Sequence, residues 1–281
     1  LLRLGSHNVR GMAAHLTDLA AIWLQQRLDV VLVQETHMTF FDAAQVAAQL
    51  NAACRELCPA HAGYAPVWGL NTTANGSRSA GVAVLARREL LSSGELQWGA
   101  EQAFKDPGGR LLVLPLQWGG HQLRLVCACL PNATGQQVDF IQQQLQPAMH
   151  AHGSYLLAAD FNFVSNLALD RVSTAPGGSQ PSTAAAQCFA NAFPGMVDVF
   201  RYRHPTRRAY THHSPTSAAR LDRWYASAAL QPYLWQCSIG DETPSDHRPV
   251  VLQLAAIGQQ QQRQGPGLLR ARVQQVWDDQ D

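Results

Sequence analysis

Several apolar segments of this chain end abruptly in an acid or an amide, and this recurring pattern constrains the fold more than any other feature. In residues 155–162, small and apolar side chains lead into Asp160, and Asn162 follows two positions later. A continuous apolar run of this length is typical of a strand buried on both faces. One such acid could be only a turn or cap residue, but the same ending recurs along the chain. The polar residues that close or precede predicted strands are Asn8, Glu35, Asp160, Asn162, Asp222, Asp246 and His247.

The hydrophobic pattern around these residues predicts an α+β protein. Apolar positions at helical spacing indicate helices, and alternating or continuous apolar runs indicate strands. We expect helices at 16–28, 42–58, 136–150 and 183–193, and strands at 1–7, 65–70, 81–90, 110–118, 122–130, 220–227 and 249–254, besides the runs that end at Glu35 and Asp160. Residues 164–182 and 201–219 are predicted to be loops. Many strands with few helices favour a two-layered β-sandwich flanked by helices over a simple parallel sheet.

The composition excludes few classes of protein. The 281 residues, 46% of them hydrophobic, suit one large domain or two small ones. A net charge of +1 gives no overall bias toward a charged partner. No apolar run reaches the roughly 18 residues that span a bilayer, so we expect no membrane partner. The cysteines include no Cys-x-x-Cys pair, so buried free thiols are expected rather than a cysteine zinc site.

Two further expectations concern the ends of the chain. We expect residues 1–256 to form one domain, and residues 257–281, with their glutamine run and Gly265-Pro266-Gly267, to be a flexible tail or linker. The chain begins at Leu1, directly in a predicted strand, so we expect it to be part of a longer protein whose targeting signals are not readable here.

The strand-end residues predict a hydrolytic site if the strands share one core. The side chains would then meet at one rim, as several carboxylates, two amides and an imidazole. Hard oxygen ligands of this kind suit Mg²⁺ or Mn²⁺. A histidine next to an aspartate suits proton transfer or stabilisation of charge on phosphorus. Together they point to metal-assisted hydrolysis of a phosphodiester or a phosphomonoester.

The same residues lie in five short motifs that occur in a familiar order. They are His7-Asn8-Val9-Arg10-Gly11, Val33-Gln34-Glu35-Thr36, Ala159-Asp160-Phe161-Asn162, Arg220-Leu221-Asp222-Arg223 and Ser245-Asp246-His247. This series, which reaches to about residue 256, resembles the endonuclease/exonuclease/phosphatase superfamily. The resemblance implies the DNase I-like fold, a four-layer α/β/β/α sandwich.

Within that superfamily the chain is most similar to the apurinic-type endonuclease domain of non-LTR retrotransposons. The similarity rests on Gln34-Glu35-Thr36-His37, on Asp106-Pro107-Gly108-Gly109-Arg110-Leu111-Leu112, and on Tyr210-Thr211-His212-His213-Ser214. The glycine-rich tail also resembles the linker toward a reverse transcriptase in such elements. The resemblance therefore implies a reverse transcriptase domain in the parent chain, an isolated or truncated nuclease domain here, and a nuclear or cytoplasmic location.

The resemblance also implies roles for the metal-side residues. Glu35 would be the main metal ligand. Asn8 would lie near the metal and orient Asp160, and Asp246 would support the metal or its waters. The plainer interpretations are a solvated acid for Glu35 and a turn residue for Asn8.

The remaining catalytic roles concern water and phosphate. Asp160 would orient or deprotonate the attacking water, and Asn162 would hold a phosphate oxygen. His247 would bind the scissile phosphate, and Asp222 would hold the His247 ring. A turn role for Asn162 and a structural role for His247 are the alternatives.

Two positions depart from the pattern of the family. Cys129 stands where a tyrosine usually precedes the segment Leu130-Pro131-Asn132, and a thiol lacks the reach and the hydrogen bond of a phenol. Loss of one such contact typically lowers the rate by about two to three orders of magnitude. His212 stands where a tryptophan is frequent, and we expect it to affect DNA binding more than chemistry.

A basic stretch near the C-terminal half predicts contacts with the DNA backbone. Residues 201–223 contain six arginines and one acid, although a solvated loop is the alternative interpretation. The expected DNA-contacting residues are Arg201, Arg203, Arg207, Arg208, His212, Arg220 and Arg223.

Taken together, the sequence and the resemblance predict a DNA endonuclease that requires Mg²⁺ or Mn²⁺ and nicks one strand by attack of water on phosphorus. A phosphatase or exonuclease of the same fold is the second hypothesis. The third is a domain that binds nucleic acid with little or no catalysis because Cys129 replaces the usual tyrosine.

Overall fold

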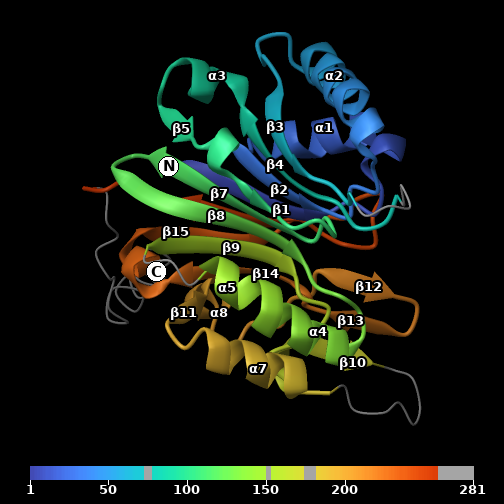
Figure 1. Ribbon diagram of the computed structural model, residues 1–281, viewed down its shortest axis with the longest axis vertical. Coiled ribbons are helices and arrows are strands. Elements are labelled where there is room, and N and C mark those ends of the chain that lie inside the picture. Colours follow the sequence, from blue (N-terminus) through green and yellow to red (C-terminus); the bar gives the residue numbers. More distant parts are fainter. Residues whose placement is uncertain (73–77, 150–152, 174–181, 259–281) are drawn as a thin grey trace, which may run out of the picture.

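Two mixed β-sheets packed face to face form the centre of the protein, and helices cover both outer faces (Figure 1). The structure, a computed structural model, describes residues 1–72, 78–149, 153–173 and 182–258. The predicted tail therefore lies outside the described residues except for its first two positions.

The first sheet has the strand order β15-β16-β1-β2-β4-β3. Its strands are β1 (Leu2–Asn8), β2 (Val30–Gln34), β3 (Tyr64–Gly69), β4 (Val82–Arg87), β15 (Leu234–Ile239) and β16 (Val250–Leu254). Strands β1 and β2 run parallel, and the other neighbours in this sheet run antiparallel.

The second sheet has the order β11-β14-β9-β8-β7-β5, and β6 pairs with β7. Its strands are β5 (Leu96–Trp98), β6 (Phe104–Lys105), β7 (Leu111–Trp118), β8 (His121–Cys129), β9 (Ser154–Asp160), β11 (Met196–Asp198) and β14 (Asp222–Ser227). A small third sheet contains β10 (Arg171–Ser173), β12 (His212–Ser214) and β13 (Ser217–Ala219).

Helices flank the two large sheets. They are α1 (Leu16–Gln25), α2 (Phe40–Leu57), α3 (Arg88–Ser92), α4 (Thr134–Phe140), α5 (Gln146–Met149), α6 (Leu167–Asp170), α7 (Ala184–Ala192) and α8 (Val199–Arg203). A π-helical turn, Ile141–Leu145, joins α4 to α5, and short 3₁₀ helices lie at Met12–Ala14, Ala100–Gln102 and Ala228–Tyr233. No helix among the described residues is long and apolar enough to cross a membrane.

Three buried clusters confirm the predicted four-layer α/β/β/α sandwich. The central cluster lies between the sheets, where Leu32 and Val84 of the first sheet pack with residues such as Leu125 of the second. The outer face of the first sheet packs against α1 and α2, with Trp23 fully buried. The outer face of the second sheet packs against α4 and α7 through a cluster that contains Phe161. The nearly continuous burial of the central strands follows from this arrangement, because each sheet is covered on both faces.

The differences from the predicted elements fall mainly at short or edge strands. The predicted strand 81–90 ends at Arg87, and α3 follows. The predicted loops 164–182 and 201–219 contain α6, β10, α8, β12 and β13, while residues 174–181 lie outside the described part. Edge strand β15 was not predicted. Strands of three residues carry too little apolar pattern to stand out, and an edge strand is only partly buried.

Glu35 lies in the loop that follows β2, and Gly81 holds this loop in place. A substitution of Gly81 therefore tests this part of the fold. Thr36 N donates to Gly81 O at 2.9 Å, and Gly81 has a φ of +91°. An added methyl group would also collide with the Thr36 hydroxyl. We expect Gly81→Ala to lower the free energy of unfolding by about 1 kcal/mol for the backbone strain and by about 1–3 kcal/mol more for the collision, as measured in urea.

The matched control is Gly94→Ala. Gly94 also has a positive φ, +75°, but nothing lies within 4 Å of its added methyl group. Only the backbone term should then remain. Equal losses in the two variants would show that the Thr36 contact does not hold this loop in place.

Candidate active site

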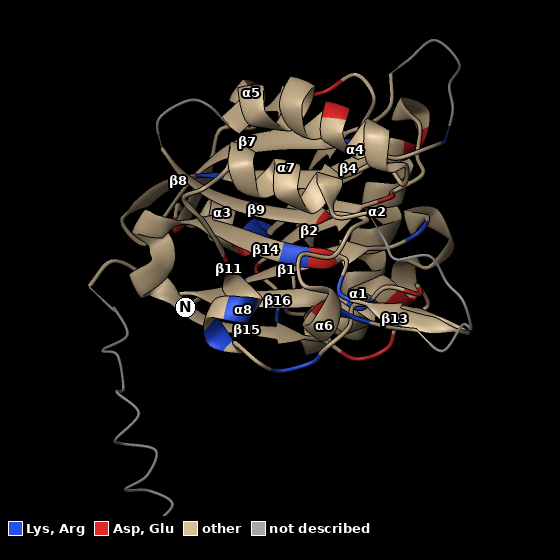
Figure 2. Ribbon diagram, turned by 90° about the horizontal axis from the view of Figure 1, so that it is seen from below, with Lys and Arg blue, Asp and Glu red and all other residues tan. Residues whose placement is uncertain are grey.

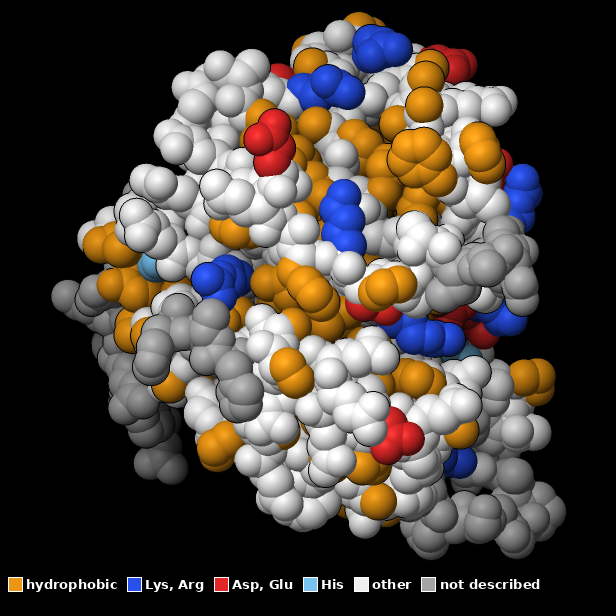
Figure 3. All heavy atoms as spheres, in the orientation of Figure 1, with side chains coloured by type: hydrophobic (Ala, Val, Ile, Leu, Met, Phe, Trp, Pro, Cys, Tyr) orange, Lys and Arg blue, Asp and Glu red, His pale blue; other side chains and the backbone are white. Residues whose placement is uncertain are grey.

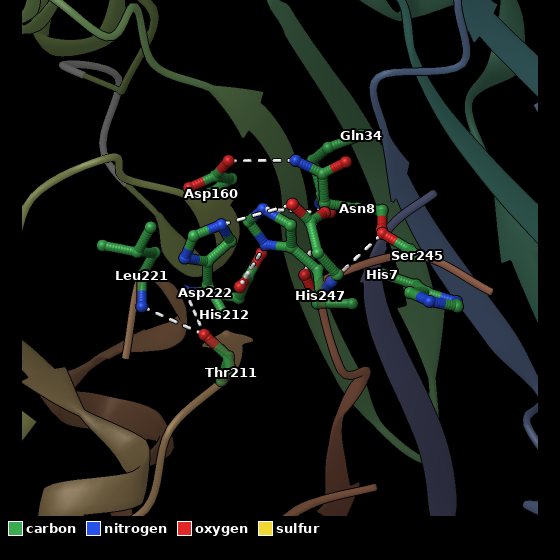
Figure 4. Close-up of polar contacts among 12 residues, drawn as sticks. His7, Asn8, Gln34, Asp160, Thr211, His212, Leu221, Asp222, Ser245 and His247 are labelled. Carbon is green, nitrogen blue, oxygen red and sulfur yellow. Dashed lines mark hydrogen bonds and ion pairs between the residues drawn. The ribbon is translucent and has the colours of Figure 1, made fainter. Parts of the chain in front are cut away.

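Backbone register brings the predicted site residues to one edge of the sandwich. In the first sheet, Asn8 at the end of β1 lies opposite Gln34 at the end of β2. In the second sheet, Asp160 at the end of β9 lies opposite Asp222 at the start of β14. Strand β16 runs antiparallel to β1, so the preceding segment with His247 returns to the same edge. Figure 4 shows these side chains pointing toward one another, and in Figure 3 acidic, basic and histidine side chains gather where the two halves of the molecule meet.

The side chain of Asn8 lies between two carboxylates. Its Nδ2 donates to Glu35 Oε1 at 3.1 Å and to Asp160 Oδ2 at 3.0 Å. Its Oδ1 accepts from the backbone N of Arg10 at 3.1 Å, which fixes the orientation of the amide. Asn8 is fully buried, so its position is set by packing and these contacts. The contact with Asp160 that the resemblance implies is therefore present.

Glu35 and Asn162 occupy left-handed backbone conformations at the ends of their strands. Their φ angles are +54° and +52°. Asn tolerates this conformation better than most residues, whereas Glu rarely adopts it. Asn162 N donates to Asp160 Oδ1 at 3.0 Å, and its Nδ2 donates to Leu130 O at 2.8 Å. Asn162 thus makes the turn contact that the sequence left as an alternative, and it holds Asp160 in place.

His247 and Asp222 form a buried pair across the two sheets. His247 Nδ1 lies 2.8 Å from Asp222 Oδ2. The negative charge of Asp222 raises the pKa of His247 to about 9, against the opposing effect of burial. The same pairing holds the pKa of Asp222 below its usual value although burial acts in the other direction. Thr211 Oγ1 accepts from the backbone N of Asp222 at 3.0 Å and so fixes the start of β14.

The surroundings of Asp160 disfavour its charged form. Burial, and next the charge of Asp222, raise the pKa of Asp160 to about 7. Its side chain is almost fully buried, and the His247 charge and the Asn8 hydrogen bond offset these effects only in part. The site therefore holds more negative charge than its own residues compensate.

These residues fit a divalent cation. Oxygen atoms of Glu35 and Asp160 and the sulfur of Cys129 lie within 4.8 Å of one another. Carboxylate oxygens are preferred ligands of Mg²⁺ and Mn²⁺, and a dication here would compensate the excess negative charge. The donor set does not identify the ion.

Cys129 lies where its sequence position predicts, directly beside this carboxylate pair. Its Sγ is 4.0 Å from Glu35 Oε1, and the residue is buried. Burial and the two neighbouring carboxylates raise the pKa of its thiol well above the usual value. The thiol is therefore neutral, and it extends less far into the site than a phenol would.

Two of the predicted DNA contacts are wrong, because their side chains lie inside the protein. Arg220 is 1% exposed and binds Asp170 through Nε at 2.8 Å and Asp198 through Nη2 at 2.7 Å. Arg223 is fully buried and donates to Phe163 O at 2.7 Å. Each is an arginine on or next to β14 that packs inward. The sequence shows that Arg220 and Arg223 are charged, but it does not show that their side chains point into the protein.

The other predicted DNA contacts are divided between two regions. Arg207 and Arg208 are exposed, and Arg203 is partly exposed. Arg201 pairs with Asp170 and donates to His204 O. Arg201 and Arg203 belong to α8, where Figure 2 shows basic residues in blue. The N-cap residue of this helix, Asp198, binds Arg220, the residue that follows β13 (Figure 1).

His212, in contrast, lies in the site itself. Its ring centroid is 4.7 Å from that of His247, and its Nε2 is 3.3 Å from Asp246 Oδ2. His212 thus contacts the predicted catalytic histidine, and its expected effect on DNA binding stays a prediction. Asp246 is also held by Arg10, whose Nη1 lies 2.5 Å from Asp246 Oδ2.

His7 is a site residue to which the sequence analysis gave no role. Its ring is fully buried, and Nδ1 accepts from Trp23 Nε1 at 3.3 Å. Burial lowers the pKa of His7 to about 4, so the ring is neutral. A histidine next to Asn8 in an apolar strand was the available signal. Ser245 supports the same region, because its hydroxyl donates to Asn8 O at 2.9 Å.

The buried neutral ring of His7 predicts a loss of stability in acid. Above pH 6.5 the ring is neutral in both the folded and the unfolded state, so its full contribution is present. As the pH falls from 6.5 to about 4, the unfolded chain binds a proton that the folded protein excludes, so stability falls, by about 3 kcal/mol at most. Urea unfolding should show a steeper decline in the wild type than in His7→Asn over this interval.

The control is His15→Asn, which removes a partly exposed histidine from the start of α1. That variant should keep the steep wild-type decline. If His7→Asn declines as steeply as the wild type, the neutral ring of His7 is not a source of the acid sensitivity.

Comparisons with known proteins agree with this fold. The sequence profile of the Endonuclease/Exonuclease/phosphatase family matches residues 5–247. The AP endonuclease LMAP from Leishmania major has a similar structure, with a TM-score of 0.71, 19% identity, and coverage of 90% of this chain and 87% of that one. The structure is also similar to that of an AP endonuclease from Archaeoglobus fulgidus, with a TM-score of 0.65, 16% identity, and coverage of 90% of this chain and 99% of that one. It is similar as well to the 3′ phosphatase NExo from Neisseria bound to a product DNA hairpin, with a TM-score of 0.66, 18% identity, and the same coverages. No curated protein sequence matches the chain. With 243 residues covered by the family profile and with this fold, the chain belongs to the endonuclease/exonuclease/phosphatase family.

Proposed function

We propose that this protein is a divalent-metal-dependent DNA endonuclease that nicks one strand, of the kind found in non-LTR retrotransposons. The observation that carries the proposal is the bridge from Glu35 through Asn8 to Asp160, which lies on the same edge as the Asp222–His247 pair. A carboxylate pair for a cation and a charged imidazole for a phosphate are what phosphodiester hydrolysis requires.

His247 is suited to bind the scissile phosphate. With a pKa of about 9 it is protonated at neutral pH, and Asp222 holds its Nδ1 side. The Nε2 side of the ring therefore offers a charged donor toward the open edge. Such a donor stabilises negative charge that develops on a phosphate oxygen in the transition state. Asp222 keeps the ring in the required orientation and charge state.

Asp160 is suited to act on the attacking water. Its raised pKa, about 7, makes its carboxylate a better proton acceptor than an ordinary aspartate. Asn8 and the backbone N of Asn162 hold its two oxygens, so its direction is fixed. Asn162 lies next to it and would contact a phosphate oxygen.

Glu35, with Asp160 beside it and Asn8 between them, would hold the divalent cation, and Asp246 would support its waters. The cation would supply a positive charge that polarises the phosphate and lowers the pKa of a water molecule.

A second candidate is a 3′ phosphatase or exonuclease of the same fold. It is favoured by the similarity to the Neisseria 3′ phosphatase and to a 3′–5′ exonuclease from Neisseria meningitidis (TM-score 0.65, 19% identity). Internal nicking of supercoiled plasmid supports the endonuclease. Release of phosphate or of single nucleotides from DNA ends, without nicking, supports the second candidate.

Removal of Glu35 should abolish cleavage. Because Glu35 is the proposed principal metal ligand, we expect Glu35→Ala to lower the rate of Mg²⁺-dependent plasmid nicking by about two orders of magnitude or more. The measurement is conversion of supercoiled to nicked plasmid. Glu101→Ala, which removes an exposed acid near β6, is the control and should cut at the wild-type rate. Equal nicking by both variants, or none by the wild type, contradicts the proposal.

A tyrosine at position 129 tests whether Cys129 limits the rate of nicking. The thiol of Cys129 donates to Glu35 Oε1 only at 4.0 Å, and it is a weaker donor of shorter reach than a phenol. We expect Cys129→Tyr to raise the nicking rate about 100-fold. Cys129→Ser, which offers a hydroxyl of short reach, is the control and should change the rate little. A folded Cys129→Tyr variant, judged by circular dichroism, that cuts no faster than the wild type contradicts this role for position 129.

A further inference from the structure

We propose that His212, Asp246 and His247 form a binding site for a transition-metal dication of the Zn²⁺ type, distinct from the hard-cation site at Glu35 although Asp246 would also support the waters of that cation. One ring nitrogen of each histidine and a carboxylate oxygen of Asp246 lie within 4.8 Å of one another. Neither the family match nor the similar structures assign a role to His212.

Backbone pairing builds this cluster. His212 at the start of β12 forms an isolated antiparallel bridge with His247. The bridge is flanked by hydrogen bonds from His213 N to Asp246 O, 3.1 Å, and from Arg248 N to Thr211 O, 2.7 Å. The two histidines are thus a non-hydrogen-bonded pair, the arrangement in which opposite side chains lie closest. The ring distance of 4.7 Å follows from this register.

The donor atoms converge on one side of the pair. His212 Nε2 lies 3.3 Å from Asp246 Oδ2, and His247 Nε2 lies 4.0 Å from Asp246 Oδ1. The side chains of His212 and Asp246 are 25% and 28% exposed, and that of His247 is 7% exposed. A cation entering there would meet two imidazole nitrogens and one carboxylate, with room for water as a fourth ligand.

Two further observations point to a bound cation. Asp246 Oδ1 is buried and has no hydrogen-bond partner among the described residues, whereas Oδ2 already binds Arg10. In addition, Asp222 holds Nδ1 of His247 at 2.8 Å. A histidine that binds a metal through Nε2 usually donates its other nitrogen to a carboxylate in this way. The orienting contact of a metal-binding histidine is therefore in place.

The ligand types favour zinc over magnesium. Two imidazoles suit Zn²⁺, Co²⁺ or Ni²⁺, while Mg²⁺ prefers oxygen ligands throughout. Two effects oppose binding: zinc must displace a proton from His247 Nε2, and the positive charge of Arg10 lies nearby. Arg10 is 58% exposed, so its side chain can turn toward solvent.

Occupancy of this site would inhibit cleavage, a consequence that rests on the proposed function. Zinc on His247 Nε2 occupies the atom that would otherwise bind the scissile phosphate. Zinc added to a reaction that contains Mg²⁺ should then slow nicking, and His212→Asn should need more zinc for half-inhibition, relative to its own zinc-free rate.

The test measures zinc binding by isothermal titration calorimetry on the metal-free protein at neutral pH, without DNA. His212→Asn should weaken zinc binding about tenfold or more. The matched control is His213→Asn, the next residue on β12, whose side chain points to the opposite face of the strand and which is not part of the cluster. The control should bind zinc as tightly as the wild type.

The outcomes separate the inference from the proposed function. Equal zinc binding by His212→Asn and the wild type overturns the site. Loss of binding in Cys129→Ser but not in His212→Asn overturns it as well, because zinc then binds at the Glu35–Cys129–Asp160 cluster. A protein that binds zinc through His212 but never cuts DNA supports the site and refutes the nuclease.

Discussion

The active edge depends on hydrogen bonds that cross from one sheet to the other. Asn8 belongs to the first sheet and Asp160 to the second, and the 3.0 Å contact between them joins the two layers at their rim. The Asp222–His247 pair also joins the two layers, because Asp222 belongs to the second sheet and His247 to the segment before β16 of the first sheet. Each contact lies in a region from which water is excluded, so an unmade bond would cost the full desolvation penalty of its polar groups. The relative position of the sheets and the geometry of the site are therefore set by the same interactions.

The electrostatics of this edge follow from placing three ionisable groups in one buried cluster. Asp160, Asp222 and His247 are all buried or nearly so. The negative charge of Asp222 raises the pKa of His247, and the positive imidazolium in turn lowers the pKa of Asp222. His247 therefore keeps its proton and Asp222 remains ionised. Asp160 has only an amide, a backbone N–H and a more distant imidazole to offset its charge, and its pKa rises. Two aspartates opposite each other on neighbouring strands thus acquire different proton affinities, the condition under which one can act as a base and the other as a support.

Much of this arrangement could be predicted from sequence, and the reasons for the failures are specific. An apolar run that ends in an acid marks the end of a buried strand, so Glu35 and Asp160 were identifiable at once. Their convergence also required the strand order, which the ordered motifs supplied through resemblance. Arg220 could not be interpreted in this way, because its partner Asp170 lies 50 positions away in a segment predicted to be a loop. The orientation of a charged side chain next to a short strand depends on such distant partners. The hydrophobic pattern of the neighbouring residues does not identify these partners.

The two departures from the family pattern have different physical consequences, although both lie at the active edge. Compared with the tyrosine that the resemblance implies at this position, the short thiol of Cys129 beside Glu35 has less reach and is a weaker hydrogen-bond donor. His212 replaces a ring that has no metal-binding atom with one that has two nitrogens, and β12 aligns it with His247. Cys129 weakens a proposed contact with the substrate, while His212 adds a proposed metal ligand beside Asp246. Both positions therefore bear on the proposed chemistry, Cys129 through its contact with Glu35 and His212 through its contact with His247.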